Sequence, residues 1–261
     1  MPTSFSPVAS QGLARFELLM AFVRREVGVR YKEAYVGVAW AVLQPLAYMV
    51  IFTLLFSRMG KLPGSGPLVA YVALVPWIYA AAAIGQSSQS VLGQLGIVSK
   101  IYFPRSVLPL SSILAAGLDA LIAFVLQLVL MLALGVRLAP TLLLWPFLML
   151  LTGAICLGVS LILAPAIVRF RDLRYIIPLG LQLLLLASPV GYPLDAVPRH
   201  LRGWYQLNPF AGLLESFRAI ALGGHLPRLD HLLPAVVWAA GLMIVGGCFF
   251  RAQEATLADY V

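Results

Sequence analysis

The sequence predicts an all-α integral membrane protein, and three observations support this. Hydrophobic residues make up 61% of the 261 residues, against roughly 45–50% in soluble domains. Charged residues make up only 11%, and the mean hydropathy is +0.94. Long charge-free stretches recur along the chain, without the strict alternation of barrel strands. A soluble globule of this size could not bury so much apolar surface, and the composition also excludes a disordered chain.

Charged residues divide the chain into six long charge-free stretches, one of them interrupted by Asp119. Each stretch is long enough to cross the hydrocarbon core of a bilayer, which takes about 20 apolar residues. We therefore expect six transmembrane helices within a domain of residues 34–261. They lie at about residues 35–57, 67–92, 107–136, 141–168, 175–191 and 233–250. An even number of spans places both termini on one side of the membrane.

The distribution of Lys and Arg predicts which side that is. The N-terminal segment, loops 93–105 and 169–174, and the C-terminus together hold 11 of these residues, whereas the short loops on the other side hold three. Because short cytoplasmic loops carry the excess of positive charge, we expect both termini in the cytoplasm. The net charge of +8 is then mostly a topology signal. A nucleic-acid partner would require a clustered basic face, and we expect none.

Residues 1–33 predict an N-terminal segment with an amphipathic interfacial helix, and no signal peptide, because the first long apolar run starts only after Glu33. Over residues 13–33 apolar side chains fall on one helical face, among them Phe16 and Tyr31, with Arg24 and Arg25 opposite. Such a helix should lie on the cytoplasmic membrane surface. It is either a simple membrane anchor or a docking surface for a cytoplasmic partner.

Two loops carry local structure signals. After Gln86 the Gln and Ser content predicts that the second span ends near Gly93, followed by a short cytoplasmic helix and turn. In the outer loop, Asn208 is a good N-cap and Pro209 occupies the favoured first helical position. A helix starting there would pair Glu215 with Arg218 and end at Gly223-Gly224. We expect short helices that re-enter the outer leaflet, which is permitted where the backbone is buried in protein or faces water.

The sequence contains no Walker phosphate loop, no HExxH and no Cys-x-x-Cys motif. Cys156 and Cys248 lie in apolar runs and are interpreted as small buried hydrophobes. Ser160 and His231 fall near opposite ends of their spans, too far apart for a nucleophile and its base. We therefore expect a protein that is not an enzyme and that binds neither a metal nor a cofactor of its own.

Two intramembrane features have alternative interpretations. Asp119 is the one charge within a span, so it either makes structural hydrogen bonds or carries protons in a secondary transporter. An aromatic line with one amide runs through the first span at a spacing of four. It either packs against neighbouring helices or lines a conduit for a sugar chain, whose C–H faces stack on rings while its hydroxyls bond to amides. The line consists of Trp40, Gln44, Tyr48, Phe52 and Phe56.

From residue 30 onward, several strings resemble the membrane subunit of polysaccharide-exporting ABC transporters, the O-antigen and capsule exporters of Gram-negative bacteria. Each string alone is common, but together and in this order they are specific. They are Arg30-Tyr31-Lys32 with Gly37-Val38-Ala39-Trp40-Ala41-Val42-Leu43-Gln44-Pro45; Lys100-Ile101-Tyr102-Phe103-Pro104-Arg105 with Leu108-Pro109-Leu110; Phe170-Arg171-Asp172-Leu173; Ser188-Pro189-Val190-Gly191-Tyr192-Pro193; Leu207-Asn208-Pro209 with Glu215-Ser216-Phe217-Arg218; and Phe250-Arg251 with Glu254 and Asp259.

The resemblance implies a homodimeric permease of the bacterial inner membrane that exports a lipid-linked polysaccharide, in the first place O-antigen on undecaprenyl diphosphate. Two cytoplasmic ATPase subunits would bind the ATP and Mg²⁺. The N-terminal helix and the loop between spans two and three would contact these subunits. The coupling residues would be Arg24, Arg25, Lys100, Tyr102 and Arg105.

The resemblance also assigns the remaining candidate residues. The aromatic line from Trp40 to Phe56 would line the conduit, and Arg15 and Arg30 would attract the anionic carrier headgroup. Exporters of capsular or teichoic-acid-type polymers, a drug or small-lipid ABC exporter, and a proton-coupled secondary transporter remain alternatives. An outer gate would be formed by Tyr192, Asn208, Pro209, Glu215 and Arg218.

Overall fold

The computed structural model describes residues 7–32, 39–58, 66–98, 103–194 and 197–254. Within these ranges the chain is helical and forms no strand. Four helical segments are long and apolar enough to cross a membrane, and two shorter helices, α2 (Ala39–Arg58) and α7 (Leu173–Leu186), are also apolar. The long segments are α3 (Pro67–Gln89), α5 (Val107–Ala133), the turn η2 (Pro140–Leu144) with α6 (Trp145–Arg169), and α10 (Leu229–Glu254). The chain is thus a multi-pass helical membrane protein.

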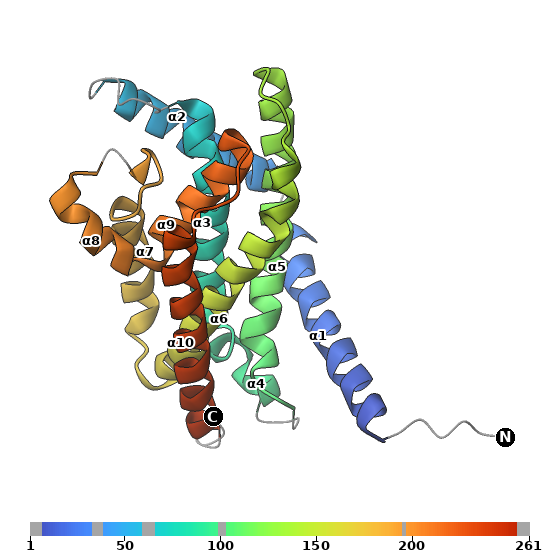
Figure 1. Cartoon of the computed structure of the whole chain (residues 1–261). Helices are drawn as coiled ribbons and strands as arrows, with labels where there is room; N and C mark the ends of the chain where they lie inside the picture. The colour runs from blue at the N-terminus through green and yellow to red at the C-terminus, as the bar shows by residue number, and fades with distance from the viewer. Residues whose placement is uncertain (1–6, 33–38, 59–65, 99–102, 195–196, 255–261) are drawn as a thin grey trace.

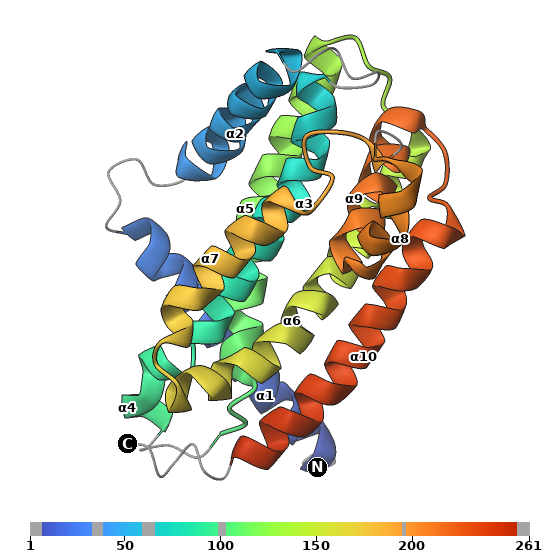
Figure 2. The ribbon, with the colours of Figure 1, turned by 90° about the vertical axis from the view of Figure 1, so that its left-hand side faces the viewer.

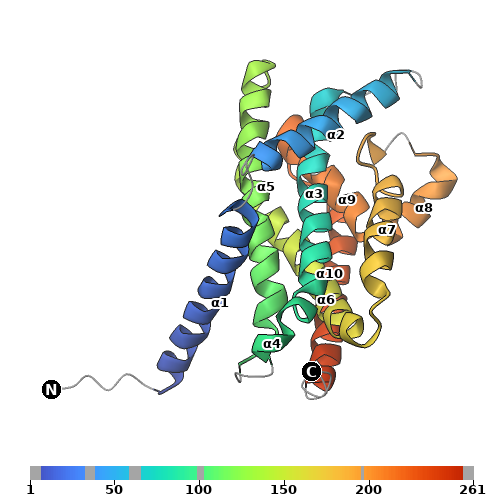
Figure 3. The same cartoon turned by 180° about the vertical axis from the view of Figure 1, so that it is seen from behind.

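Each of the six predicted spans overlaps one of these six apolar segments, although their boundaries differ. Helix α2 (Ala39–Arg58) runs obliquely across the upper part of the bundle, at a steep angle to α3 and α5 (Figures 1 and 3). Helix α7 (Leu173–Leu186) ends five residues before the predicted boundary at 191. Pro189 explains the earlier end, because a proline disfavours helical backbone in the residue before it.

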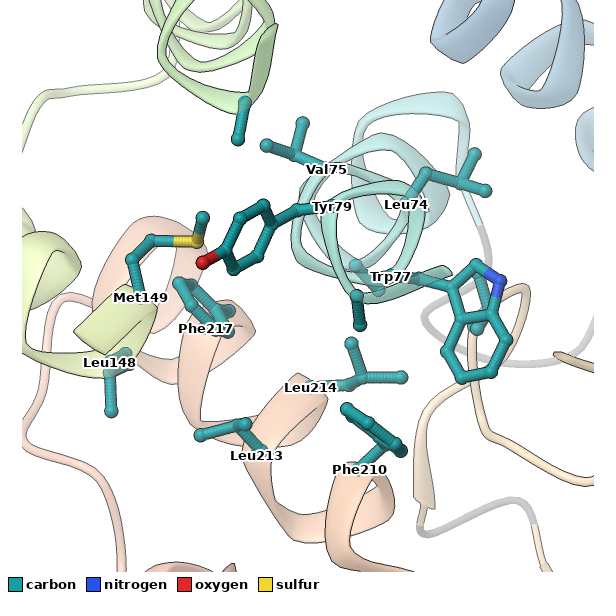
Figure 4. Packing of buried hydrophobic residues seen from close by; sticks show 14 of the residues in the cluster. Leu74, Val75, Trp77, Tyr79, Leu148, Met149, Phe210, Leu213, Leu214 and Phe217 are labelled. Carbon is teal, nitrogen blue, oxygen red and sulfur yellow. The ribbon is translucent and has the colours of Figure 1, made fainter. Parts of the chain in front are cut away.

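The core of the bundle lies around α3. This helix contacts α2, α5, α6 and α9 (Pro209–Arg218), and Tyr71 and Leu74 are fully buried. Figure 4 shows the contact between α3 and α9, where Trp77 meets Phe210 edge-on at a ring distance of 5.5 Å. Phe217 of α9 lies close to Met149 of α6 in the same view. Helix α9 is therefore packed into the bundle through its contacts with α3 and α6.

Helices α6 and α10 pack together through glycines. A Cβ atom on Gly158 would lie 2.6 Å from the backbone carbonyl carbon of Leu242, closer than real contacts allow. Cys156 is buried on α6, as expected, but the prediction that Cys248 is buried was wrong. Cys248 is exposed because α10 contacts the bundle along one side only and presents its other side, including Ile244, to the surroundings.

The N-terminal helix α1 (Pro7–Lys32) leans against α5 and reaches the middle of it (Figures 1 and 3). Phe22 is buried and stacks on Phe103 at 5.6 Å, whereas Phe16 of the predicted apolar face is 60% exposed. The start of α1 and the end of α10 lie at the same end of the bundle (Figure 2). After α3, the turn η1 (Leu92–Gln94) and the short α4 (Leu95–Val98) supply the predicted helix and turn.

The segment between α7 and α10, which we call the outer segment after the predicted topology, contains helix α8 (Arg199–Leu207), α9 and a π turn, η4 (Ala219–Gly223). The predicted helix after Asn208 is confirmed as α9, which continues directly into η4. Gly224, which has a φ of 63°, ends this helical stretch. Leu213, Leu214 and Phe217 are almost fully buried. A short helix is stable here because the bundle encloses its apolar side chains.

Candidate functional site

A polar cluster joins α1, α3 and α5 at half the length of α5. The Arg30 guanidinium forms an ion pair with Asp119 and also donates to the side-chain oxygen of Gln86. The Tyr31 hydroxyl donates to the second carboxylate oxygen of Asp119. Side chains of Arg30 and Asp119 are only 22% and 25% exposed. Both hydrogen-bond donors of this carboxylate therefore come from α1. They precede Asp119 in the sequence by 89 and 88 residues.

The protonation of Tyr31 is consistent with its role as a donor. Burial first, and then its hydrogen bond to Asp119, raises the pKa of the phenol to about 12. The hydroxyl therefore keeps its proton at neutral pH and donates to the carboxylate. Asp119 accepts from a cation and a phenol, which is the structural hydrogen-bonding role considered for it in the sequence.

The polar cluster borders a cavity of about 210 Å³ between α1, α2, α3 and α5. Arg30, Tyr31, Gln86 and Asp119 form its charged wall. The opposite wall is formed by Trp40 and Gln44 of α2, and Tyr79 of α3 also contributes. The cavity thus brings a charged pair, amides and aromatic rings to one place.

Two further cavities continue this one along α3. A cavity of about 250 Å³ shares Gln44, Ile78 and Ala82 with it and adds Tyr48 and Trp77. A third cavity, of about 460 Å³, shares Gln86 and extends toward the end of the bundle that holds the start of α1. We call the three together the α3 cavities. Their walls combine aromatic faces with amide donors and acceptors, which bind a hydroxyl-rich chain well.

The predicted conduit residues are only partly brought together. Trp40, Gln44 and Tyr48 line the α3 cavities, and Trp40 is 60% exposed. Phe52 is half-buried and packs against the apolar core instead. Phe56 belongs to α2, but its side chain lies outside the described residues. The polar residues Gln86 and Asp119 of this site were not assigned to the conduit by sequence reasoning.

The five predicted outer-gate residues lie around the start and end of α9. Arg218 is only 4% exposed. Its guanidinium donates to the carbonyl oxygens of Val69 (3.2 Å) and Val190 (2.6 Å) and to the Glu215 carboxylate (3.0 Å). Glu215 in turn accepts from the backbone of Leu194 at 3.3 Å. One buried cation therefore ties α9 to the start of α3 and to the loop after α7.

The other gate residues form the remaining contacts of this loop. The Asn208 side chain accepts from the backbone N–H of Phe210, the residue that follows Pro209, at 3.0 Å. Its amide nitrogen donates to the Ser188 hydroxyl at 2.8 Å. The hydroxyls of Tyr192 and Tyr205 are 2.6 Å apart. Desolvation, followed by this hydrogen bond, raises the pKa of Tyr192 above its usual value. The partners Ser188 and Tyr205 were not assigned to the gate from the sequence.

The predicted coupling residues gather at the end of the bundle where α1 begins. Arg24 and Arg25 are exposed on α1, and Arg25 donates to the side chain of Gln94 in η1 at 3.2 Å. The Arg105 backbone N–H donates to the Glu254 carboxylate at 3.0 Å, and the Arg105 guanidinium donates to the Glu254 carbonyl. Lys100 and Tyr102 lie outside the described residues.

The two arginines predicted to attract the carrier headgroup line different cavities. Arg30 belongs to the first of the α3 cavities, whereas Arg15 lines a cavity beside α10. They are 15 residues apart on one helix, which corresponds to about 22 Å along its axis. Only Arg30 therefore lies beside the conduit residues.

No group of three or more His, Cys, Asp and Glu side chains that could hold a metal ion occurs in the described ranges. Ser160 is buried and hydrogen-bonds to Ser87 and to the Cys156 carbonyl. These contacts give it a structural role between α3 and α6.

The bundle of apolar helices and the row of polar cavities along α3 are features of a polytopic membrane transport protein. Residues 17–222 match the family model described as ABC-2 type transporter. The chain belongs to this family, whose members are the membrane subunits of transporters that pair with an ATPase subunit.

Similarity to individual members extends over nearly the whole chain. An "O-antigen export system permease protein RfbA" of Myxococcus xanthus is 31% identical over 254 residues, which cover 94% of this chain and 95% of that protein. An RfbA of Klebsiella pneumoniae is 29% identical over 250 residues, with the same coverage. A "Polysialic acid transport protein KpsM" of Escherichia coli is 23% identical over 90% of this chain and 92% of its own length.

Proposed function

We propose that this chain is the permease subunit of an ABC exporter that moves a lipid-linked polysaccharide across the bacterial inner membrane, in the first place O-antigen on undecaprenyl diphosphate. The observation that carries the proposal is the end-to-end similarity to O-antigen export permeases, at 31% identity. The α3 cavities support it, because Trp40, Gln44 and Tyr48 offer stacking faces and an amide to a sugar chain. The similarity to KpsM keeps capsular polysaccharide as a second candidate substrate.

In this proposal the six apolar helices are six spans, and both termini lie in the cytoplasm. The excess of Lys and Arg in the segments on that side supports the orientation. α1 then belongs to the cytoplasmic half of the membrane, and α8 and α9 belong to the outer half, where they re-enter the leaflet and gate the exit. The hydrogen bonds of Asn208, Glu215 and Arg218 would hold that gate closed.

Two copies of the chain would enclose the pathway and bind two ATPase subunits, which hold ATP and Mg²⁺. α1, η1, α4 and Arg105 would contribute to the ATPase contact, because the start of α1 lies at the same end of the bundle as α4 and Arg25 links α1 to η1 through Gln94. The Arg30 guanidinium, beside the conduit residues, would attract the diphosphate of the carrier. In this proposal the chain itself catalyses no reaction.

The proposal is tested by measuring ATP hydrolysis in lipid, first with the purified chain alone and then with the ATPase encoded by a neighbouring gene. We expect hydrolysis only in a stable complex of two permeases and two ATPases, together with ATP-dependent export of the polymer. A chain that recruits no ATPase and moves substrate along a proton gradient would contradict the assignment. Export of a small lipid or drug but of no polymer would support a different ABC exporter.

The conduit is tested by the double substitution Trp40→Ala and Tyr48→Ala. We expect polysaccharide export to fall about thirtyfold, because the two lost rings together remove about 2 kcal/mol of stacking, while assembly with the ATPase stays normal. Export is measured as lipid-linked polymer accumulated in sealed inverted vesicles. Leu43→Ala is the matched control, because Leu43 is exposed on the same helix and lines none of the α3 cavities. Equal export by the double variant and the wild-type chain would rule out this conduit.

A further inference from the structure

A further cavity lies apart from the α3 cavities, at the end of the bundle where α1 begins and α10 ends. It encloses about 420 Å³ between α1, α5, α6 and α10. Its described lining residues include none of those that line the α3 cavities. We call it the α10 cavity. Because its walls are separate, it requires an explanation other than the conduit.

The α10 cavity is amphipathic. Arg15, near the start of α1, and Arg251, in the last turn of α10, form its polar rim together with Glu254. Leu157, Leu161 and Phe250 form its apolar wall, together with Leu110 of α5. The two leucines lie two to three turns before Arg169, where α6 ends at the same end of the bundle. This part of the apolar wall is therefore deeper in the bundle than the arginines.

The rim carries an excess of positive charge. The Glu254 carboxylate accepts from the Arg105 backbone N–H, and the Arg105 guanidinium donates to the Glu254 backbone carbonyl. Arg15 and Arg251 are both exposed. Within the described ranges, no carboxylate is ion-paired with either of them. Two arginines against one described carboxylate in the lining of this cavity favour an anion.

We propose that the α10 cavity binds an anionic phospholipid of the cytoplasmic leaflet. Its phosphate lies between Arg15 and Arg251, and an acyl chain lies against Leu157, Leu161 and Phe250. Basic pockets between membrane helices on the cytoplasmic side are the sites that recognise anionic headgroups, and this rim is at the level where the apolar helices end. A zwitterionic lipid would add its own cation beside two arginines, so charge complementarity selects the anionic lipid. The bound lipid joins α1 to α10. Its binding does not depend on which polymer is exported.

Gly247 makes the site testable without disturbing helix packing. It lines the α10 cavity, and a Cβ atom there would meet no atom within 4 Å. A leucine at this position would project into the space assigned to the acyl chain. Gly241 on the same helix also has open space beside it but lines none of the cavities described above. Gly241→Leu is therefore the matched control, and both changes raise the helix propensity of α10 equally.

The experiment uses the full-length chain in nanodiscs of phosphatidylcholine, with a trace of phosphatidylglycerol that carries a photoreactive acyl chain. Crosslinked peptides are identified by mass spectrometry. We expect labelling of α6 and α10 around Leu157–Leu161 and Gly247–Arg251, and loss of this labelling in Gly247→Leu but not in Gly241→Leu. Arg15→Gln and Arg251→Gln should each weaken competition by unlabelled phosphatidylglycerol about fivefold. Thermal unfolding in phosphatidylcholine alone checks that all variants are folded.

Three outcomes would overturn the proposal. Labelling that persists in Gly247→Leu would show that the acyl chain lies elsewhere. Equal labelling by photoreactive phosphatidylcholine would show that the arginines do not select an anion. Undecaprenyl phosphate could also compete with the photoreactive lipid more strongly than phosphatidylglycerol does. This result would assign the cavity to the polymer's carrier lipid rather than to a phospholipid.

Discussion

Replacement of Asp119 with leucine is expected to destabilise the folded chain by about 3 kcal/mol. The substitution removes the carboxylate that pairs with Arg30 and accepts from Tyr31, and it leaves a largely buried guanidinium without its counter-ion. Breaking one side of a buried pair costs more than removing both, because the remaining charge stays desolvated. Urea unfolding of the purified chain in detergent, followed by circular dichroism, measures the change in the free energy of unfolding.

The double variant Arg30→Met with Asp119→Leu separates an unpaired charge from lost packing. It should recover most of the stability lost by Asp119→Leu, since apolar residues of similar size replace a buried ion pair at little cost. If the single and double variants are equally unstable, the ion pair is not the reason for the loss.

Asp119→Asn distinguishes the ATP-driven mechanism from proton-coupled transport. Asparagine keeps an acceptor oxygen for the Tyr31 hydroxyl but cannot carry a proton. An ATP-driven exporter should still export polymer with this variant, whereas a proton-coupled transporter that relies on Asp119 should lose all transport. Vesicles supplied with ATP or with a proton gradient measure the two activities separately.

Replacement of Arg218 with methionine is expected to destabilise the outer segment by about 3–5 kcal/mol. Methionine fills similar space, but it leaves the carbonyls of Val69 and Val190 and the Glu215 carboxylate without their donor in a buried position. The segment between α7 and α9 should then detach from α3. Ser188 is buried in the native chain. Labelling of a cysteine placed there should become at least about a hundredfold faster, because 3 kcal/mol corresponds to about two powers of ten. Cys248 is exposed and is first replaced by serine.

Arg228→Met is the matched control for Arg218→Met. Arg228 also pairs with an acid, Asp230, but both side chains are at least half exposed. An exposed ion pair contributes about 0–1 kcal/mol, so this variant should change neither the stability nor the labelling of position 188 measurably. Similar effects from Arg218→Met and Arg228→Met would show that burial of Arg218 is not what holds α9.

Local features of the outer segment were predictable from the sequence because they depend on neighbours along the chain. Asn208 caps α9 through Phe210, two residues later, and Glu215 pairs with Arg218 at i, i+3. Helical geometry alone brings such residues together. The conduit prediction was equally local, since a spacing of four places Trp40, Gln44 and Tyr48 on one face of α2.

The partners of Asp119, and the backbone carbonyls of α3 and the loop after α7 that Arg218 binds, were not predictable in this way. Arg30 precedes Asp119 by 89 residues, and the Val69 carbonyl is 149 residues from Arg218. A lone carboxylate within a span signals that a partner exists, but not which of many arginines supplies it. The packed face of α1 had the same difficulty, since Phe22 is buried whereas Phe16 is exposed.

By itself the sequence determined that this protein is a helical membrane protein, where its apolar helices lie, and how α9 is capped. These properties follow from composition, charge spacing and hydrogen bonds over a few residues. Only the tertiary structure decided that Arg30 meets Asp119, that Arg218 joins α9 to α3, and that Arg15 shares a cavity with α10 rather than with Arg30. Such contacts depend on how each helix is rotated and shifted against the next. That arrangement is set by the packing of the whole bundle and leaves no periodic signal in any one helix.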